Sequence, residues 1–62
     1  MRFIEGLRYW SENKYEMYVV KRFDRTGLLR VEVGLGLPAN YRVRLDSFGR
    51  EYITAKGHIF RA

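Results

Sequence analysis

The sequence predicts a small all-β protein, an antiparallel meander of about five to six short strands that forms a strongly bent sheet or an SH3- or OB-like small barrel. Three observations support this prediction. Apolar residues recur at every second position in two long stretches, the turn signature Asp-x-x-Gly separates alternating runs twice, and no stretch has the sustained period of a long helix. At 62 residues the chain has room for one domain, spanning residues 1–62.

The first ten residues are ambiguous between a strand and a helix. Phe3, Leu7 and Trp10 fall at helical spacing, but Gly6 interrupts that pattern. Leu7 and Tyr9 would instead continue an alternating apolar face. We favour the strand, and the sequence leaves both conformations open.

Alternation is clearest between residues 15 and 37, where two runs flank the linker Asp24–Gly27. This linker has Asp where a type I turn favours it and Gly where the backbone takes a positive φ. A three-residue loop then sets Phe23 opposite Leu29 and Val19 opposite Val33, with every apolar residue on one face. The apolar residues at odd positions are Tyr15, Met17, Val19, Phe23, Leu29, Val31, Val33, Leu35 and Leu37, and Lys21 is the exception.

The same register makes a prediction about the outward side of this first hairpin. Arg22 and Arg30 would face each other directly, and like charges so placed repel. We interpret the pair as kept for an anion or relieved by nearby carboxylates. Gly34 and Gly36 would alternate inside the third strand, opposite the apolar series, and would permit a sharp bend.

A second hairpin is predicted around the repeated signature Asp46–Gly49. A three-residue loop sets Glu51 opposite Leu45, whereas a two-residue loop would set Tyr52 there. We prefer the three-residue loop because of its turn chemistry. A Lys-Gly pair at 56–57 then returns the chain as a short last strand.

The composition favours an anionic partner and excludes two common ways of stabilising a small fold. The net charge is +5, so anionic molecules are attracted over long range, and nucleic acid is the commonest of them. The absence of cysteine excludes disulfides and thiolate zinc sites. A chain this short buries only about 60% of its surface on folding. We therefore expect aromatic packing or a partner subunit to compensate, and we favour a homo-oligomer.

The distribution of apolar residues along the chain indicates where in the cell the protein is expected. No apolar run approaches the roughly 20 residues needed to cross a bilayer. The first ten residues lack the continuous apolar stretch of a signal peptide. We expect a cytoplasmic protein with no membrane partner.

The residues offer little for catalysis. His58 is the only histidine, and no two carboxylates have a spacing that a hairpin register clearly brings together. The seven acidic residues are scattered and give no metal-ligand cluster. We therefore expect neither an enzyme nor a cofactor or metal. A minimal ribonuclease using His58 with a neighbouring basic or phenolic side chain is the weaker alternative.

The basic residues are better organised. In the preferred register Arg42 and Arg44 point away from the core beside Tyr52. Guanidinium groups beside an aromatic ring suit phosphate contacts and base stacking. We therefore predict a non-catalytic module that binds nucleic acid, as single strands or through the backbone. The predicted nucleic-acid-binding residues are Arg42, Arg44, Arg50, Tyr52, Arg22, Arg25, Arg30 and Phe48.

The alternative is a small protein-binding factor, such as an inhibitor or an assembly adaptor. Phe48 at a hairpin tip, Tyr18 and Trp10 would then fill pockets of the partner protein. The arginines would steer the chain to an acidic surface. Replacing Phe48 should therefore mainly weaken protein binding, whereas replacing the arginines should mainly weaken nucleic-acid binding.

Overall fold

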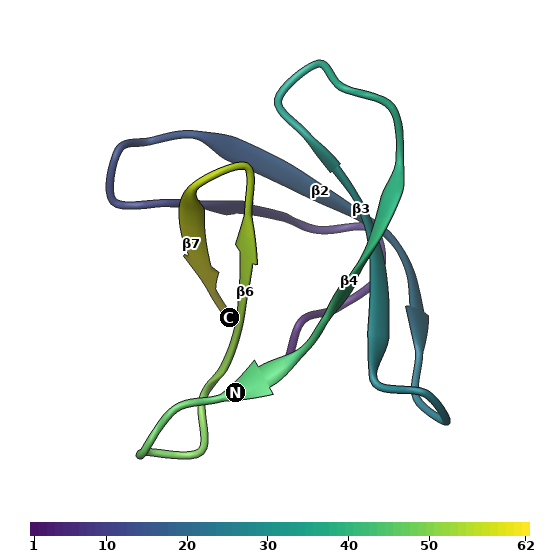
Figure 1. Cartoon of the computed structure of the whole chain (residues 1–62), viewed down its shortest axis with the longest axis vertical. Helices are drawn as coiled ribbons and strands as arrows, with labels where there is room; N and C mark the ends of the chain where they lie inside the picture. Colours follow the sequence, from purple (N-terminus) through teal and green to yellow (C-terminus); the bar gives the residue numbers. More distant parts are fainter.

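The computed structural model describes all 62 residues and contains seven β-strands and no helix. Four strands form an antiparallel sheet, here called sheet A, in the order β1 (Arg8–Trp10), β2 (Glu16–Phe23), β3 (Leu28–Val33) and β4 (Ala39–Arg42). Three more form sheet B in the order β5 (Arg44–Leu45), β6 (Glu51–Ala55) and β7 (His58–Arg61) (Figure 1). The predicted all-β antiparallel fold is confirmed.

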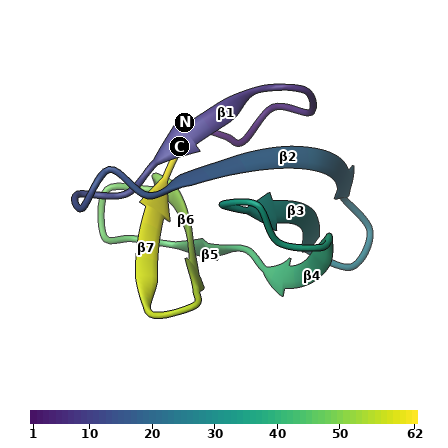
Figure 2. The same ribbon diagram turned by 90° about the horizontal axis from the view of Figure 1, so that it is seen from above.

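The two sheets are connected at both ends but do not form a closed barrel. One extended segment breaks at Val43, so that β4 pairs with β3 while β5 pairs with β6. At the other side a single antiparallel bridge joins Ser11 to Phe60 and brings β1 beside β7. Seen from above, β6 and β7 stand across from β3 and β4, with β1 and β2 passing over one end (Figure 2).

The apolar core lies between the two sheets. Phe3 enters it from the segment before β1, and its ring meets the Tyr9 ring edge-on with centroids 4.9 Å apart. Tyr41 and Val43 pack against the core from the edge where the sheets separate. The buried apolar residues are Phe3, Met17, Val19, Leu29, Val31, Val33, Ile53, Ala55, Phe60 and Ala62.

The predicted register of the first hairpin is wrong. Phe23 pairs with Leu28 rather than Leu29, and Val19 pairs with Val31 rather than Val33. The loop holds four residues, and the Gly27 N–H donates to the Phe23 carbonyl at 3.0 Å. A bulge between Val19 and Lys21 absorbs the difference, because one strand has an extra residue there.

The bulge decides which side chains face the core. Arg22 pairs with Leu29 and is therefore turned to the inner side, while Lys21 pairs with Arg30 on the outer side. The sequence suggested that Lys21 interrupts the apolar face, but Lys21 lies on the outer side and does not interrupt it. The expected outward pair of Arg22 and Arg30 is wrong, and the two like charges that face each other belong to Lys21 and Arg30.

The third strand is shorter than predicted. It ends at Val33, and Gly34 turns the chain with a φ of 62°. Gly34 and Gly36 therefore lie in a loop and not inside a strand. Leu35 and Leu37 were expected on the core face, yet both are almost fully exposed on this loop.

The second hairpin has the preferred register. Leu45 pairs with Glu51, and the Asp46 N–H donates to the Arg50 carbonyl at 2.9 Å around a three-residue loop. Gly49 has a φ of 79°, the positive value that this loop requires. The turn at residues 56–57 also forms, and β7 pairs with β6 as expected.

The segment before β1 is not a helix. Arg8–Trp10 is a strand paired with β2, which agrees with the favoured prediction. A turn precedes it, in which Gly6 has a φ of 84°. No helix in the structure is long and apolar enough to span a membrane.

Candidate nucleic-acid interface

A buried ion pair removes one of the predicted binding residues from the surface. Arg22 Nη2 lies 2.6 Å from Glu51 Oε2, and the Arg22 and Glu51 side chains are only 17% and 9% exposed. Glu51 Oε1 also accepts the Phe3 backbone N–H at 2.8 Å. Arg22 Nε further donates to Asp24 Oδ1 at 2.6 Å. Arg22 therefore joins the two sheets, and its guanidinium is already bound to two carboxylates.

The electrostatics of this cluster follow from its hydrogen bonds. The Arg22 guanidinium lowers the pKa of Glu51 below its usual value, and the Phe3 N–H adds to this effect, although burial opposes it. The same guanidinium lowers the pKa of Asp24. The pKa of Arg22 is raised in return, chiefly by its hydrogen bond to Glu51. All three groups stay charged near neutral pH.

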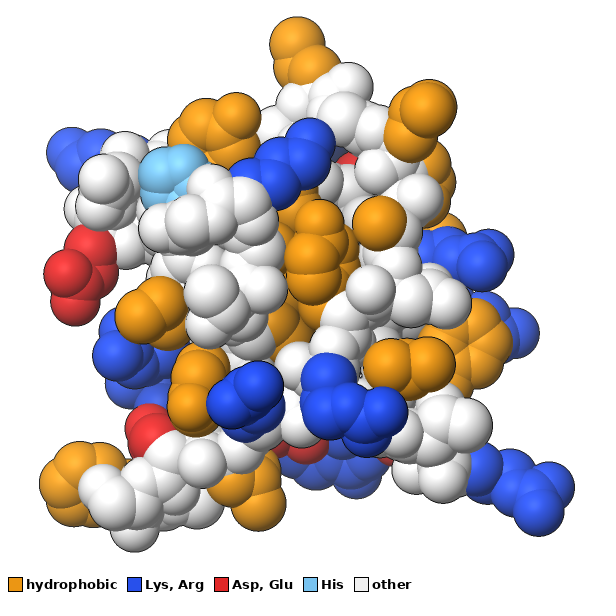
Figure 3. Space-filling model, in the orientation of Figure 1, with side chains coloured by type: hydrophobic (Ala, Val, Ile, Leu, Met, Phe, Trp, Pro, Cys, Tyr) orange, Lys and Arg blue, Asp and Glu red, His pale blue; other side chains and the backbone are white.

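Most other basic side chains have no acidic partner. Of the twelve lysines and arginines, only Arg2, Arg22 and Arg61 lie within 4.0 Å of a carboxylate. The Arg61 contact, with the exposed Glu12, is long at 3.9 Å. Figure 3 shows basic side chains spread over the lower half of the molecule, around β4, β5 and β7, with few acidic ones between them. On this face, basic side chains therefore outnumber acidic ones.

Sheet B arranges part of this charge in a regular pattern. Arg44 pairs with Tyr52, and Tyr52 pairs on its other side with Arg61. The three side chains share the outer face, because the alternate residues Ile53 and Phe60 point into the core. A half-buried tyrosine thus lies between two exposed arginines.

Trp10 extends the pattern by one strand. The antiparallel bridge between Ser11 and Phe60 places Trp10 next to Arg61, and both residues line one surface depression. Ser11 and Phe60 are buried, so their neighbours Trp10 and Arg61 point outward. The outer face of sheet B and the adjoining β1 of sheet A therefore carry Arg44, Tyr52, Arg61 and Trp10 in order, one on each of four strands. We call these four residues the arginine–aromatic row.

Arg50 lies close to the same face. Its side chain lines the depression with Trp10 and Arg61, and its Nε donates to the Ala62 carbonyl at 2.5 Å. The Asp46 carboxylate at this end accepts the backbone N–H groups of Arg50 and Phe48, which lower its pKa. Asp46 is thus used to hold the hairpin loop.

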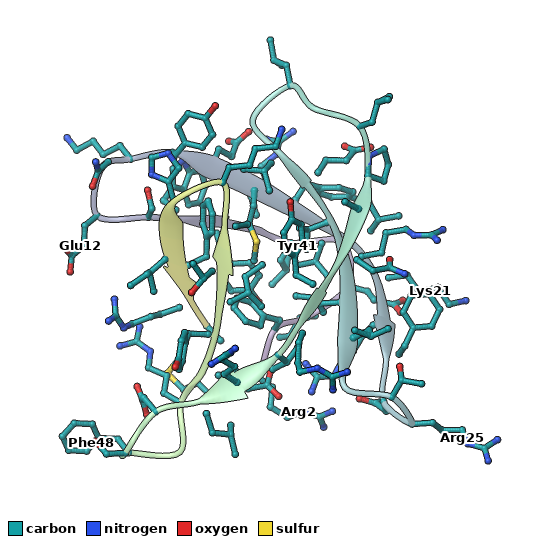
Figure 4. All side chains as sticks on the ribbon, in the orientation of Figure 1. Arg2, Glu12, Lys21, Arg25, Tyr41 and Phe48 are labelled. Carbon is teal, nitrogen blue, oxygen red and sulfur yellow. The ribbon has the colours of Figure 1, made fainter.

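Phe48 lies at the tip of this hairpin and is 93% exposed. Figure 4 shows it pointing away from the rest of the molecule. Its ring has no contact with the arginine–aromatic row that the structure records. Phe48 is therefore a separate exposed feature, available to a partner of any class.

The remaining predicted residues lie on sheet A. Arg42 pairs with Leu28 and not with a sheet B strand, so it does not flank Tyr52. Arg30 Nε donates to Asn40 Oδ1 at 3.1 Å, and its guanidinium carbon lies 5.9 Å from the Phe23 ring centre. Arg25 projects from the first hairpin tip, away from both faces (Figure 4). The predicted residues thus divide between two faces, and only Arg44, Tyr52 and Arg50 share the region of the row.

Two members of the row, Trp10 and Arg61, were not among the predicted binding residues. Arg61 belongs to a strand whose register could not be assigned from the sequence. Trp10 comes beside it only through the bridge between β1 and β7, which joins segments about 50 residues apart. The local signal that could have found Arg61 is its alternation with the buried Phe60.

No cluster of three potential metal-ligating side chains is present. His58 stacks on the Tyr15 ring with centroids 4.3 Å apart, beside the tight turn between β6 and β7. Sheet B, together with the adjoining β1, thus presents three arginines and two aromatic side chains on one face. No protein-family model matches the chain, and comparisons with curated proteins and with solved structures found no significant similarity.

Proposed function

We propose that the protein is a non-catalytic module that binds single-stranded nucleic acid on the outer face of sheet B. The observation that carries this proposal is the arginine–aromatic row, in which Tyr52 and Trp10 alternate with Arg44 and Arg61. Aromatic side chains stack on bases and arginines bind phosphates, which is the combination that single-strand binders use.

The spacing of the row suits an extended strand. Neighbouring β-strands lie about 4.8 Å apart, so Tyr52 and Trp10, separated by one strand, stand roughly 10 Å from each other. Two bases can therefore stack on separate rings while Arg61 lies between them. In a duplex the base faces are stacked within the helix, and only the arginines would then make contact. We expect single strands to bind more tightly than duplexes of the same sequence.

Contacts to phosphate and stacking on bases carry little sequence information. Binding should therefore depend on salt more than on sequence, with a slope near 0.7 per phosphate contact when the logarithm of affinity is plotted against that of salt. Fluorescence anisotropy with a labelled oligonucleotide of mixed sequence measures this slope. Absence of binding at low salt overturns the proposal.

A matched pair of variants tests the face. Tyr52→Ala should weaken single-strand binding about tenfold, since stacking contributes roughly 1–3 kcal/mol per base. Tyr18→Ala is the control, because Tyr18 is also surface-accessible but lies on the outer face of sheet A, between Arg8 and Glu32. No loss in either variant would assign the binding to overall charge, and equal losses in both would show that binding is not confined to sheet B.

A protein partner is the second candidate, favoured by the exposure of Phe48. Comparison of Phe48→Ala with the double variant Arg44→Ala and Arg61→Ala separates the two functions. Nucleic-acid binding predicts that only the double variant loses oligonucleotide affinity. A protein-docking function predicts that the Phe48→Ala variant no longer captures the partner protein. In that case neither variant, nor the unchanged protein, binds the oligonucleotide. Self-association remains a prediction, and native mass spectrometry over a range of concentrations tests it.

A further inference from the structure

The edge of sheet A at β4 is open. β4 is the last strand of that sheet, and the chain then leaves it at Val43 to enter sheet B. In an antiparallel ladder successive residues direct their backbone groups alternately toward and away from the partner strand. The Val43 N–H donates to the Gly27 carbonyl at 2.9 Å, so Tyr41 also faces β3. The backbone groups of Asn40 and Arg42 therefore point away from β3, and no strand pairs with them.

The facing part of β6 is open as well. The Ala62 N–H donates to the Glu51 carbonyl at 2.9 Å, so by the same alternation the Thr54 backbone points away from β7. β5 pairs with β6 only at Tyr52 and Glu51 and does not reach Thr54. β4 and β6 thus present unpaired backbone groups toward the gap where sheets A and B separate (Figure 1).

The floor of this gap is apolar. Tyr41 and Val43 are half-buried and pack against the core from β4 and from the break after it. Figure 4 shows Tyr41 between the ribbons of β4 and β6, and Figure 3 shows hydrophobic side chains exposed at the same place. An extended chain lying there would bury every second side chain against this floor.

The rim of the gap is basic. Lys56 reaches from the turn between β6 and β7 across to the loop between β3 and β4, where a Cβ on Gly36 would lie 2.7 Å from its Nζ. Arg42 lies on the exposed edge strand itself. Neither the Arg42 nor the Lys56 side chain is ion-paired. Glu51 carries the only carboxylate on β4, β5 or β6, and it is bound to Arg22. Acidic side chains of an incoming segment would therefore meet cations with no acidic competitor.

We propose that the open edge of β4 binds an extended segment of a partner protein in which apolar and acidic residues alternate. The segment adds a strand to sheet A, because pairing with an exposed sheet edge supplies backbone hydrogen bonds while alternate side chains supply specificity. Its apolar residues lie on Tyr41 and Val43, and its acidic residues face Arg42 and Lys56. A second copy of this chain fits less well, because its own Arg42 would then lie in the same seam.

The first test uses a capped octapeptide of alternating glutamate and valine, with an octapeptide of alternating lysine and valine as the control of equal apolar content. Nuclear magnetic resonance of the labelled protein follows the backbone amides. We expect the glutamate peptide to protect the amides of Asn40 and Arg42 from hydrogen exchange and the lysine peptide to leave them unchanged. Binding that leaves both amides unprotected overturns the proposal.

The second test removes one edge donor. Asn40→Pro deletes an N–H that points away from β3 and so leaves the ladder of sheet A intact. Asn40→Ala is the matched control, since both variants lose the hydrogen bond from Arg30. We expect the proline variant to bind the glutamate peptide at least tenfold more weakly than the alanine variant. Equal affinities contradict edge pairing.

Two further outcomes would assign the edge to a different partner. Protection of Asn40 and Arg42 that rises with protein concentration in the absence of peptide indicates self-association and overturns the proposal. Protection of the same amides by an oligonucleotide would assign the edge to nucleic acid and would also overturn the proposal. The proposal is independent of nucleic-acid binding by the arginine–aromatic row, because Tyr52→Ala should leave peptide affinity unchanged.

Discussion

The two hairpins carry the same Asp-x-x-Gly signature and nevertheless have different geometry. At Asp46–Gly49 the loop has three residues and the flanking ladder is regular, whereas at Asp24–Gly27 the loop has four residues and a bulge precedes it in β2. The two hairpins differ in the side-chain contact that the bulge permits. In the first hairpin Arg22 points inward and binds Glu51, which lies on β6 of the second hairpin. The regular ladder of the second hairpin already places Glu51 for this contact. The same turn signature thus locates both hairpins but does not by itself fix their register.

The largest effect expected from this comparison comes from Glu51→Ala. The variant removes the acceptor of the Phe3 N–H and the ion-pair partner of Arg22, which keeps only Asp24 and the Phe3 carbonyl. Breaking one side of a buried pair costs about 3–5 kcal/mol. A domain of this size has a total free energy of unfolding of only about 3–9 kcal/mol. We expect urea denaturation to show a largely unfolded protein. A loss below about 1 kcal/mol would mean that the pair does not determine the register of the first hairpin.

Acid should weaken the ion pair that joins the two hairpins, as well as the Asp46 loop of the second hairpin. The pKa of Glu51 and that of Asp24 are lowered in the folded state, so their contribution is complete above the unfolded value, 4.5 for Glu51, and is lost as pH falls through the folded value. Thermal denaturation between pH 7 and pH 2 should show falling stability below about pH 4.5. Glu51→Gln should flatten this profile, and an unchanged profile in the variant would contradict the assignment.

The turn glycines should behave alike in both hairpins. Gly27 and Gly49 have φ values of 71° and 79°, and an alanine in this region costs about 1–2 kcal/mol. A Cβ at Gly49 would meet nothing within 4 Å, and one at Gly27 would come only to 3.9 Å from Arg42. Gly27→Ala and Gly49→Ala should therefore reduce the free energy of unfolding equally. A much larger loss at Gly27 would show that its loop also supports the bulge.

The smallest effect is expected at the tip of the second hairpin. Phe48 is almost fully exposed, so Phe48→Ser should change the free energy of unfolding by no more than about 0.5 kcal/mol. Phe23→Ser is the comparison in the first hairpin, where the ring is half-buried and lies near Lys21 and Arg30. We expect the Phe23 variant to lose more in chemical denaturation. Equal losses would indicate that Phe48 is covered in solution, for example by another copy.

Local patterns predicted much of this fold. Alternation identified the buried Met17, Val19, Leu29 and Val31, and turn chemistry gave the correct pairing of Leu45 with Glu51. These predictions succeeded because each depends on residues close together in sequence. Alternation failed as a guide at Leu35 and Leu37. There the alternating pattern continues past the end of the strand, but the chain turns away at Gly34.

The candidate site was less predictable than the fold. The pairing of Arg44 with Tyr52 follows from a hairpin register and was anticipated correctly. The position of Arg42 was not, because the break at Val43 moves it to the other sheet. Trp10 joins the row through a bridge between opposite ends of the chain, and no local pattern records such a contact.

The carboxylate of Glu51 also has a consequence for the order of folding. It binds Arg22, 29 residues away, and the backbone of Phe3, 48 residues away. Contacts of such separation require closure of long loops, which is entropically slow, whereas each hairpin closes within a few residues. The hairpins should therefore form early and the Glu51 contacts late, so that the N-terminal segment docks only after both sheets exist. A protease acting during refolding should cleave that segment first.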